Sequence, residues 1–234
     1  GAVDQQIAAV LVLEDAGESA VVFGASGYET VRLARPLTDA FGFRRARRAF
    51  GRLTTAIRDR LKRNHIIIRK IDMKNFKAEA KALREVYNKA WDRNLGFVPM
   101  TEKEFDYLAK DLKLVMDPDF CFVAEQEGKL VAFSLSIPDI NQVLIKINKG
   151  RLFPFGIIKL LLLKRRIKGL RLMALGVIDG YRKMGIDACL YGLSIKAFRE
   201  KKYEYAEVSW TLEHNDMVNR AIEQANGIAY RKYR

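Results

Sequence analysis

The stretch from residue 170 to residue 201, LRLMALGVIDGYRKMGIDACLYGLSIKAFREK, contains three successive local patterns. It opens with an apolar run, Leu172 to Ile178, which has the length and composition of a buried β-strand. A turn-rich segment follows, from Asp179 to Gly185. From Ile186 onward, apolar residues recur at helical spacing and form one stripe. The stretch therefore predicts a strand, a basic loop that contains glycine, and a helix in direct succession.

The loop between the predicted strand and helix is suited to hold a phosphate group. The first amides of a helix have no partner within the helix, and the helix dipole places partial positive charge there. Gly185 allows the backbone to approach a ligand closely, and Arg182 and Lys183 add full positive charge. Many loops of this composition have no ligand, and their basic residues only keep the surface soluble. The loop also lacks the GK[ST] ending of a P-loop and the three-glycine dinucleotide fingerprint, so it matches both motifs poorly.

The segment YRKMGIDA, residues 181–188, resembles motif A of the GCN5-related N-acetyltransferases (GNAT). The pattern of that family is Arg/Gln-x-x-Gly-x-Gly/Ala, and Asp187 stands where the family has Gly or Ala. The resemblance implies that backbone amides of the loop bind the pyrophosphate of coenzyme A and that the preceding strand pairs with its pantetheine. The residues implied in cofactor binding are Leu175, Val177, Arg182, Lys183, Met184, Gly185, Ile186, Asp187 and Ala188.

Composition limits the partners and the location of the protein. The 234 residues carry a formal net charge of +14, which suits an anionic partner such as coenzyme A, a membrane surface or nucleic acid. No apolar run reaches 18 residues and no signal peptide is visible, so a cytoplasmic protein is expected. Cys121 and Cys189 are isolated within apolar runs and are predicted to be buried thiols. His65 and His214 are far apart and lack a cysteine partner, so no metal site is expected.

The order of elements around the loop extends the resemblance. From His65 the patterns predict a strand, two helices, a hairpin of two strands, and then the strand, loop and helix described above. A strand at 206–212, a helix at 217–225 and a short strand at 229–233 follow. This order is that of the GNAT fold, so residues 65–234 are expected to form one α+β (mixed α/β) acyltransferase domain, a mixed sheet flanked by helices. A further strand that closes the sheet would be missing or supplied from elsewhere.

Residues 1–64 are expected to form a separate segment. A hairpin is predicted at 4–26, a short helical pattern at Val31 to Ala40, and a basic helical linker with little apolar face at 54–64. The arginines between residues 44 and 48 suit either nucleic acid or a solvated edge strand or helix face. By resemblance, the segment is a partial or degenerate first GNAT-like unit.

The resemblance also implies site residues outside the loop. Asn215 fits the position of an Asn that opens the helix after the fifth strand, and Asn219 lies one turn further on. Both are expected to bind the cofactor, although Asn215 alternatively caps its helix. The tyrosine that the family often carries is replaced by Ile222. Glu213 and Glu207 are candidates for the catalytic base, or are solvated surface carboxylates.

Two segments are candidates for the acceptor side of the site. In the family, the connection between the first two helices borders the acceptor, so Trp91, Asn94 and Phe97 are predicted to bind substrate. The segment from Gln142 to Lys168 is an atypical insertion in which apolar residues are flanked by lysines and arginines. This composition suits an anionic lipid interface or, alternatively, a core helix or strand with solvated ends.

Two classes of function follow from these observations. The first is an N-acyltransferase that uses acetyl-CoA or a longer acyl-CoA and transfers the acyl group directly to an amine, which the insertion suggests is hydrophobic or amphiphilic. The second is a catalytically inactive GNAT-like binding module that uses its basic surface on nucleic acid or an anionic membrane. The sequence has no aromatic-basic interleaving typical of RNA-reading surfaces, which disfavours nucleic acid.

Overall fold

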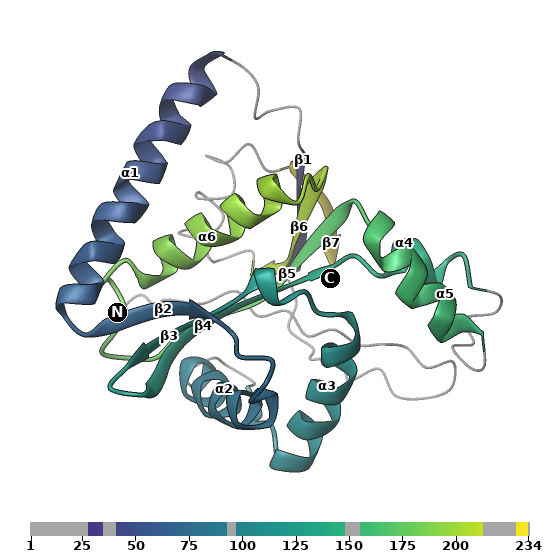
Figure 1. Ribbon diagram of the computed structural model, residues 1–234, viewed down its shortest axis with the longest axis horizontal. Coiled ribbons are helices and arrows are strands. Elements are labelled where there is room, and N and C mark those ends of the chain that lie inside the picture. The colour runs from purple at the N-terminus through teal and green to yellow at the C-terminus, as the bar shows by residue number, and fades with distance from the viewer. Residues whose placement is uncertain (1–27, 35–40, 93–96, 148–154, 213–227, 234) are drawn as a thin grey trace.

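The computed structural model describes residues 28–34, 41–92, 97–147, 155–212 and 228–233. Its centre is a mixed sheet of seven strands in the order β2-β3-β4-β5-β6-β1-β7 (Figure 1). Among the strands that the structure describes, β5 and β6 are parallel and all other neighbours are antiparallel. The strands are β1 (Tyr28–Ala34), β2 (Ile66–Lys70), β3 (Cys121–Gln126), β4 (Lys129–Pro138), β5 (Gly169–Val177), β6 (Tyr205–Leu212) and β7 (Ile228–Tyr233).

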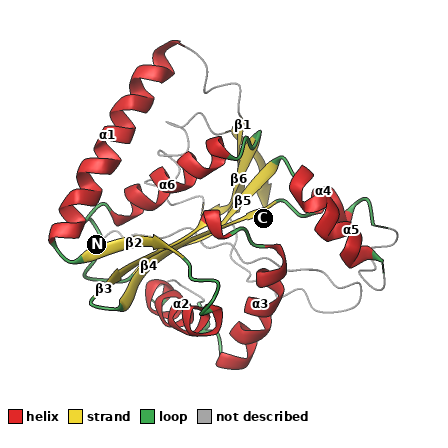
Figure 2. Cartoon of the chain, in the orientation of Figure 1, coloured by secondary structure: helices red, strands yellow, loops and turns green. Residues whose placement is uncertain are grey.

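Helices cover both faces of this sheet (Figure 2). They are α1 (Phe41–Arg63), α2 (Phe76–Trp91), α3 (Glu102–Val115), α4 (Asn141–Leu144), α5 (Gly156–Leu163) and α6 (Ile186–Glu200), with short 3-10 helices η2 (Pro118–Phe120) and η4 (Lys164–Arg166). Because successive strand residues point to opposite faces, Leu175 on β5 packs with α1 and α6, whereas Ala174 packs with α2. The two faces therefore carry separate cores.

Local sequence signals explain the starts of α2 and α3. Thr101 and Glu104 form a capping box, in which each side chain binds the backbone amide of the other residue. Asp72, a residue type that commonly caps helices, does not cap α2, because α2 begins one turn later, after Asn75. Asp72 instead accepts hydrogen bonds from the backbone amide of Lys74 and the side-chain amide of Asn75. These bonds stabilise the turn that leads into α2.

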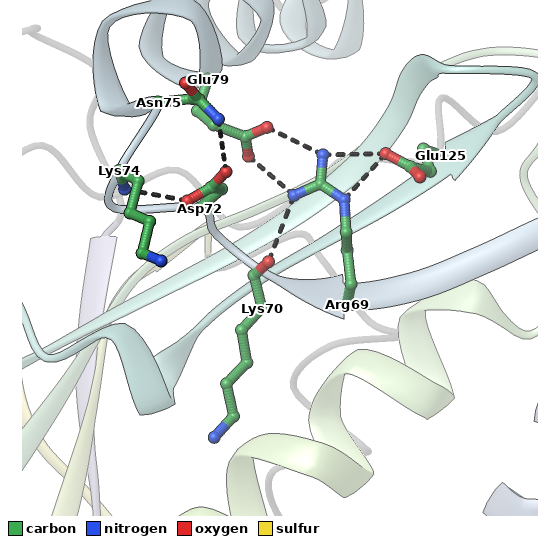
Figure 3. A network of polar contacts seen from close by, with 7 residues as sticks. All are labelled: Arg69, Lys70, Asp72, Lys74, Asn75, Glu79 and Glu125. Atoms are coloured by element: carbon green, nitrogen blue, oxygen red, sulfur yellow. Dashed lines mark hydrogen bonds and ion pairs between the residues drawn. The ribbon is translucent and has the colours of Figure 1, made fainter.

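Arg69 on β2 joins three elements on the α2 side of the sheet (Figure 3). Its guanidinium donates to both carboxylate oxygens of Glu79 on α2, at 3.0 and 2.8 Å. The same group donates to Glu125 on β3 at 2.8 Å. The ion pair with Glu79 is bidentate, which fixes the orientation of α2 as well as its position.

The predicted order of elements from residue 65 is confirmed throughout the described part of the chain. β2, α2, α3, the β3–β4 hairpin, β5, α6, β6 and β7 follow one another as expected. The helix expected at 217–225 and the hairpin expected at 4–26 lie outside the described residues. No helix among the described residues is long and apolar enough to cross a membrane. The expected cytoplasmic localisation stays a prediction.

The N-terminal part of the chain differs from expectation. The helical pattern predicted from Val31 is wrong for the residues up to Ala34, which belong to strand β1. β1 lies between β6 and β7 and pairs antiparallel with both, so the N-terminal part of the chain contributes a strand to the sheet. Cross-strand pairing with residues far along the chain has overridden the local pattern. The domain boundary at residue 65 stays a prediction, although strands on both sides of it share one sheet.

The basic segment before β2 is a packed helix. The arginine-rich residues 44–48 lie within α1, which favours the helix over the edge strand. The expectation of a linker with little apolar face is wrong, because Leu61 is fully buried and Ile57 packs against the same core cluster. Two apolar residues four positions apart are enough to attach the helix, since they lie on one face.

Candidate cofactor and acceptor site

Strands β5 and β6 separate part-way along their length. Their parallel pairing joins residues 169–172 to residues 205–208, whereas β5 continues to Val177 and β6 to Leu212. Met173 is an extra residue in the β4–β5 register, because Leu135 pairs with Ala174 and Ser136 pairs with Leu172. Such a bulge bends a strand and increases its twist. The sheet consequently opens between residues 173–177 of β5 and the end of β6.

The loop from β5 to α6 reaches this opening with an unusual backbone. Gly185 precedes the first residue of α6 and has a left-handed conformation, with φ of 84°. Lys183 is also left-handed, with φ of 63°, whereas Met184 between them is not. Alternating backbone conformations of this kind direct successive amides into a concave site for anions. Because glycine has no side chain to cap the helix, the first amides of α6 can serve a ligand.

Helix α1 supports the loop from one side. The Arg60 guanidinium donates to the Met184 carbonyl at 2.7 Å. A Cβ atom on Gly185 would lie 2.8 Å from Cγ2 of Ile57, a distance that real contacts do not reach. Since α1 also packs against β2, it approaches α6 from the side opposite to β6. No local sequence pattern indicates this support. The side of the loop that faces the strand opening is not covered by α1.

The guanidinium of Arg182 is bound within the protein. Its nitrogens lie 3.3 Å from the Val177 carbonyl oxygen, 3.2 Å from the Ala90 carbonyl oxygen and 3.1 Å from a carboxylate oxygen of Asp179. These contacts join the loop to the last turn of α2. The predicted role of Arg182 in cofactor binding stays a prediction, and these contacts direct its guanidinium toward the protein itself. Lys183 and Asp187 are exposed at the surface of the loop and helix start.

One of the two candidate bases lies within the sheet. Glu207 on β6 is 5% exposed, and its carboxylate accepts a hydrogen bond from Arg171 Nε at 3.1 Å. The two residues face each other in the paired part of β5 and β6, immediately before the opening. Glu213, Asn215 and Asn219 lie outside the described residues, so their predicted roles stay predictions.

Trp91 forms the wall of the site on the α2 face. It is 1% exposed, and a Cβ atom on Gly176 of β5 would lie 2.6 Å from its ring. Its ring centroid is 4.7 Å from that of Tyr87, which in turn lies 5.6 Å from that of Phe97. Asn94 lies outside the described residues. Trp91 therefore packs under β5, as buried aromatic side chains commonly do, and its predicted contact with substrate stays a prediction.

Two buried polar groups beside this part of β5 have no hydrogen-bond partner among the described residues. They are Nε1 of Trp91 and Oγ of Ser134. Ser134 is paired in register with Leu175, and Trp91 packs on Gly176, so both groups neighbour the portion of β5 that has left β6. Buried polar groups are nearly always hydrogen-bonded, and exceptions call for an explanation.

An apolar cavity of about 80 Å³ lies between α2, α3 and the sheet. Its lining includes Ala80 and Leu83 of α2, Leu108 of α3, and Met173 and Ala174 of β5. The last two residues are also the first ones after β5 has separated from β6. The cavity therefore shares a wall with the strand opening, a relation that the sequence patterns did not reveal.

Two acetyltransferases are among the solved structures that resemble this chain. One is a GCN5-related N-acetyltransferase from Sphaerobacter thermophilus, which is 14% identical with a TM-score of 0.48 and covers 72% of this chain and 43% of that one. Another is the aminoglycoside N-acetyltransferase AAC(6')-Iy in complex with CoA, 12% identical with a TM-score of 0.45, covering 71% of this chain and 91% of that one. The chain itself has the expected element order from β2 to β6, a parallel pair that opens and a glycine-led helix. Its described residues form the GNAT-like mixed sheet flanked by helices that the sequence predicts.

Two curated proteins share sequence with this chain. Protein YghO of Escherichia coli strain K12 is 35% identical over 178 residues, which cover 74% of this chain and 45% of that protein. The bacterial ceramide synthase of Caulobacter vibrioides is 33% identical over 175 residues, which cover 72% and 45%. The chain thus spans less than half the length of both relatives. No family model matches the chain.

Proposed function

We propose that this chain carries the catalytic unit of an acyl-CoA-dependent N-acyltransferase whose amine acceptor is hydrophobic or amphiphilic. The observation that carries the proposal is the opening between β5 and β6, which lies beside a loop whose left-handed Lys183 and Gly185 lead into α6. The edge of β5 suits the amide-containing pantetheine arm of coenzyme A. The neighbouring start of α6 suits its pyrophosphate.

The backbone would provide most of the binding groups. Residues 173–176 of β5 have left β6, so that edge can hydrogen-bond the pantetheine amides as a neighbouring strand would. The amides from Lys183 to Ala188 would bind the pyrophosphate at the start of α6. Acyl-CoA would supply the activated acyl group as a thioester, which the amine attacks directly.

The cysteines favour direct transfer over a covalent enzyme intermediate. Burial raises the pKa of the Cys121 thiol and also that of the Cys189 thiol. A thiol that stays protonated is a poor nucleophile. The chain would therefore act mainly by holding the amine and the thioester close together, with Glu213 and Glu207 as the candidate bases. Trp91 Nε1 on the α2 face of the sheet and Ser134 Oγ on the opposite face both lack a partner among the described residues, so each face offers one donor beside β5.

The apolar cavity favours a substrate with an aliphatic chain. Its wall is almost entirely apolar and begins at Met173, where the thioester would arrive. A volume of about 80 Å³ holds the end of a chain, rather than a whole one. One curated relative is named a ceramide synthase, and ceramide contains an amide between a fatty acyl group and a lipid amine. We therefore propose an acyl donor longer than acetyl and a lipid-like amine.

Calorimetric titration with coenzyme A tests the cofactor half of the proposal. Asp187→Ala gives the loop the small residue of the family pattern and removes a negative charge beside the phosphates, so the affinity for coenzyme A should rise about threefold to tenfold. The same change should slightly destabilise α6, since an acidic residue at a helix N-terminus is favourable by roughly 0.3–1 kcal/mol. Gly185→Glu should abolish binding. Absence of binding by the wild-type protein would refute the cofactor site.

Release of free thiol tests the reaction. Palmitoyl-CoA and acetyl-CoA should be compared as donors, with a long-chain amine and a small polar amine as acceptors. We expect thiol release to require an amine and to be fastest with palmitoyl-CoA and the long-chain amine. Salt-sensitive binding to random oligonucleotides without thiol release would instead support the non-catalytic binding module.

A further inference from the structure

The α4–α5 insertion exposes a group of large apolar side chains. These residues, named here the α5 patch, are Ile145, Phe155, Ile158, Leu161 and Leu162, and their exposed fractions range from 53 to 85%. Phe155, Ile158 and Leu162 are spaced three and four positions apart and therefore lie on one face of the helix. Large exposed apolar groups that lie together mark an interaction surface.

The opposite face of the same helix is anchored in the core. Leu160 and Gly156 are buried, and Leu160 packs with Val143, Ile147 and Ile167 in one cluster. Lys164 donates to the Leu114 and Met116 carbonyl oxygens at 3.3 and 2.9 Å, which joins the end of α5 to the end of α3. The buried face of α5 has the packing expected of a core helix. Its exposed face has the composition expected of a lipid interface. Because the core face holds α5 in place, the α5 patch is a fixed feature of the surface.

All charged residues in the sequence around the α5 patch are positive. No aspartate or glutamate occurs between Asp139 and Asp179, whereas nine lysines and arginines do. Arg165 and Arg166 are exposed directly after α5, and neither forms an ion pair with any described residue. Lys159 donates to the Lys146 carbonyl oxygen rather than to an acid. A partner that fits this surface combines an apolar interior with negative charge at its boundary.

We infer that the α5 patch docks on an anionic lipid bilayer. Apolar side chains enter the acyl region and flanking cations bind the headgroups when a helix lies in an interface in this way. Nucleic acid offers negative charge but no apolar layer for five large side chains. With eight residues, α5 is too short to span the bilayer and would lie within its surface.

The α5 patch lies close in sequence to the strand opening, so docking would bring the candidate site near the membrane. This step rests on the proposed function. The insertion leads into β5 at Gly169, and β5 separates from β6 after Leu172. Three residues of strand span about 10 Å, so the membrane surface and the strand opening would be near each other. In Figure 1, α4 and α5 lie at the side of the molecule away from α1, so α1 does not obstruct this approach. A lipid amine could thus enter the site from the bilayer.

Co-sedimentation with vesicles tests the docking without any cofactor. The wild-type protein should bind vesicles of phosphatidylglycerol and phosphatidylcholine, and bind phosphatidylcholine alone much more weakly. Ile158→Ser with Leu162→Ser should weaken binding at least tenfold. Arg165→Gln with Arg166→Gln should weaken binding to the anionic vesicles about 25-fold, the equivalent of roughly 1 kcal/mol for each arginine.

A matched variant separates the α5 patch from general surface apolarity. Leu53 on α1 and Ile195 on α6 are also exposed, so Leu53→Ser with Ile195→Ser removes two large apolar groups elsewhere and should leave binding unchanged. Equal loss in the two double variants, or no binding by the wild type, would overturn the inference. The wild-type protein could instead form a dimer without binding vesicles, and Ile158→Ser with Leu162→Ser could make that dimer monomeric. This outcome would overturn the inference, because the α5 patch would then bind a second copy of the chain. If the protein binds vesicles but does not bind coenzyme A, the docking inference is supported and the proposed function is refuted.

Discussion

Gly185 illustrates how one residue meets two independent constraints. Its backbone is left-handed, and the space where a Cβ atom would lie is filled by Ile57. The sequence motif indicates the first constraint, since glycine is expected in such loops. The second depends on Ile57 of α1. Because this residue is more than one hundred positions from Gly185, no local sequence pattern indicates the contact. Gly180 shares the left-handed backbone, with φ of 87°, but has open space around it.

These two glycines give a matched pair of variants. Gly180→Ala should cost about 1 kcal/mol through backbone strain alone. Gly185→Ala should cost roughly 1–3 kcal/mol more, because the added methyl group overlaps Ile57, and should also weaken coenzyme A binding. Urea denaturation and calorimetry measure the two effects. Adding Ile57→Ala to Gly185→Ala should recover part of the stability, and failure to do so would show that the overlap is relieved in another way.

Arg69 is the second residue with a large expected effect. Arg69→Met leaves the carboxylates of Glu79 and Glu125 facing each other, and the Glu79 side chain is only 11% exposed. We expect a loss of about 2–3 kcal/mol in the free energy of unfolding, measured with urea. Arg84→Met is the control, because its ion pair with Glu102 is 3.9 Å long and Glu102 is 63% exposed. That variant should change stability by less than about 0.5 kcal/mol, and similar losses in both would contradict the interpretation.

At the scale of elements, η2 joins the end of α6 to the end of β2. Asp119 of η2 accepts from Lys201, at 2.7 Å, and from Lys70. Hydrogen bonds from Lys201 and then from Lys70 hold the pKa of Asp119 below its ordinary value. A carboxyl group whose pKa is lowered by folding adds stability above its unfolded pKa, which is about 4. That stability is lost as the pH falls from about 4 through the lower folded value.

Asp119→Asn therefore should flatten the pH dependence of stability in acid. The wild-type urea midpoint should fall more steeply between pH 5 and pH 3 than that of the variant. Hydrogen bonds also hold the pKa values of Asp72 and Glu104 below their ordinary values, so part of the wild-type slope should remain in the variant. Parallel curves for the two proteins would show that the bonds to Asp119 do not contribute.

Elements were predictable where local patterns and tertiary contacts agree. The run Leu172 to Ile178, the capping box at Thr101 and the helical stripe after Gly185 each carry their own signal, and the structure confirms the elements. β1 carries no such signal, because its strand conformation depends on partners near residues 205 and 228. The loop of the candidate site could be found from its motif. The cavity, the support from α1 and the inward turn of Arg182 could not, since each joins segments distant in the chain.

At the scale of the whole molecule, β1 makes the N-terminal segment part of the sheet. Removing residues 1–40 would leave neighbouring edges of β6 and β7 unpaired. We expect this truncation to lose cooperative thermal unfolding and to associate through the exposed strands. Removing residues 1–27 keeps β1 and should preserve the transition. Size-exclusion chromatography and calorimetry distinguish the two, and equal behaviour would mean that β1 is dispensable.

The insertion of β1 between β6 and β7 also sets the order of events during synthesis. Residues 28–34 leave the ribosome before both of their partners, which are translated more than 170 residues later. β1 therefore stays unpaired while α2, α3 and the β3–β4 hairpin can already form from neighbouring residues. Pairings of such long sequence separation fold slowly, so the nascent chain passes through a stage in which β1 has neither of its strand partners.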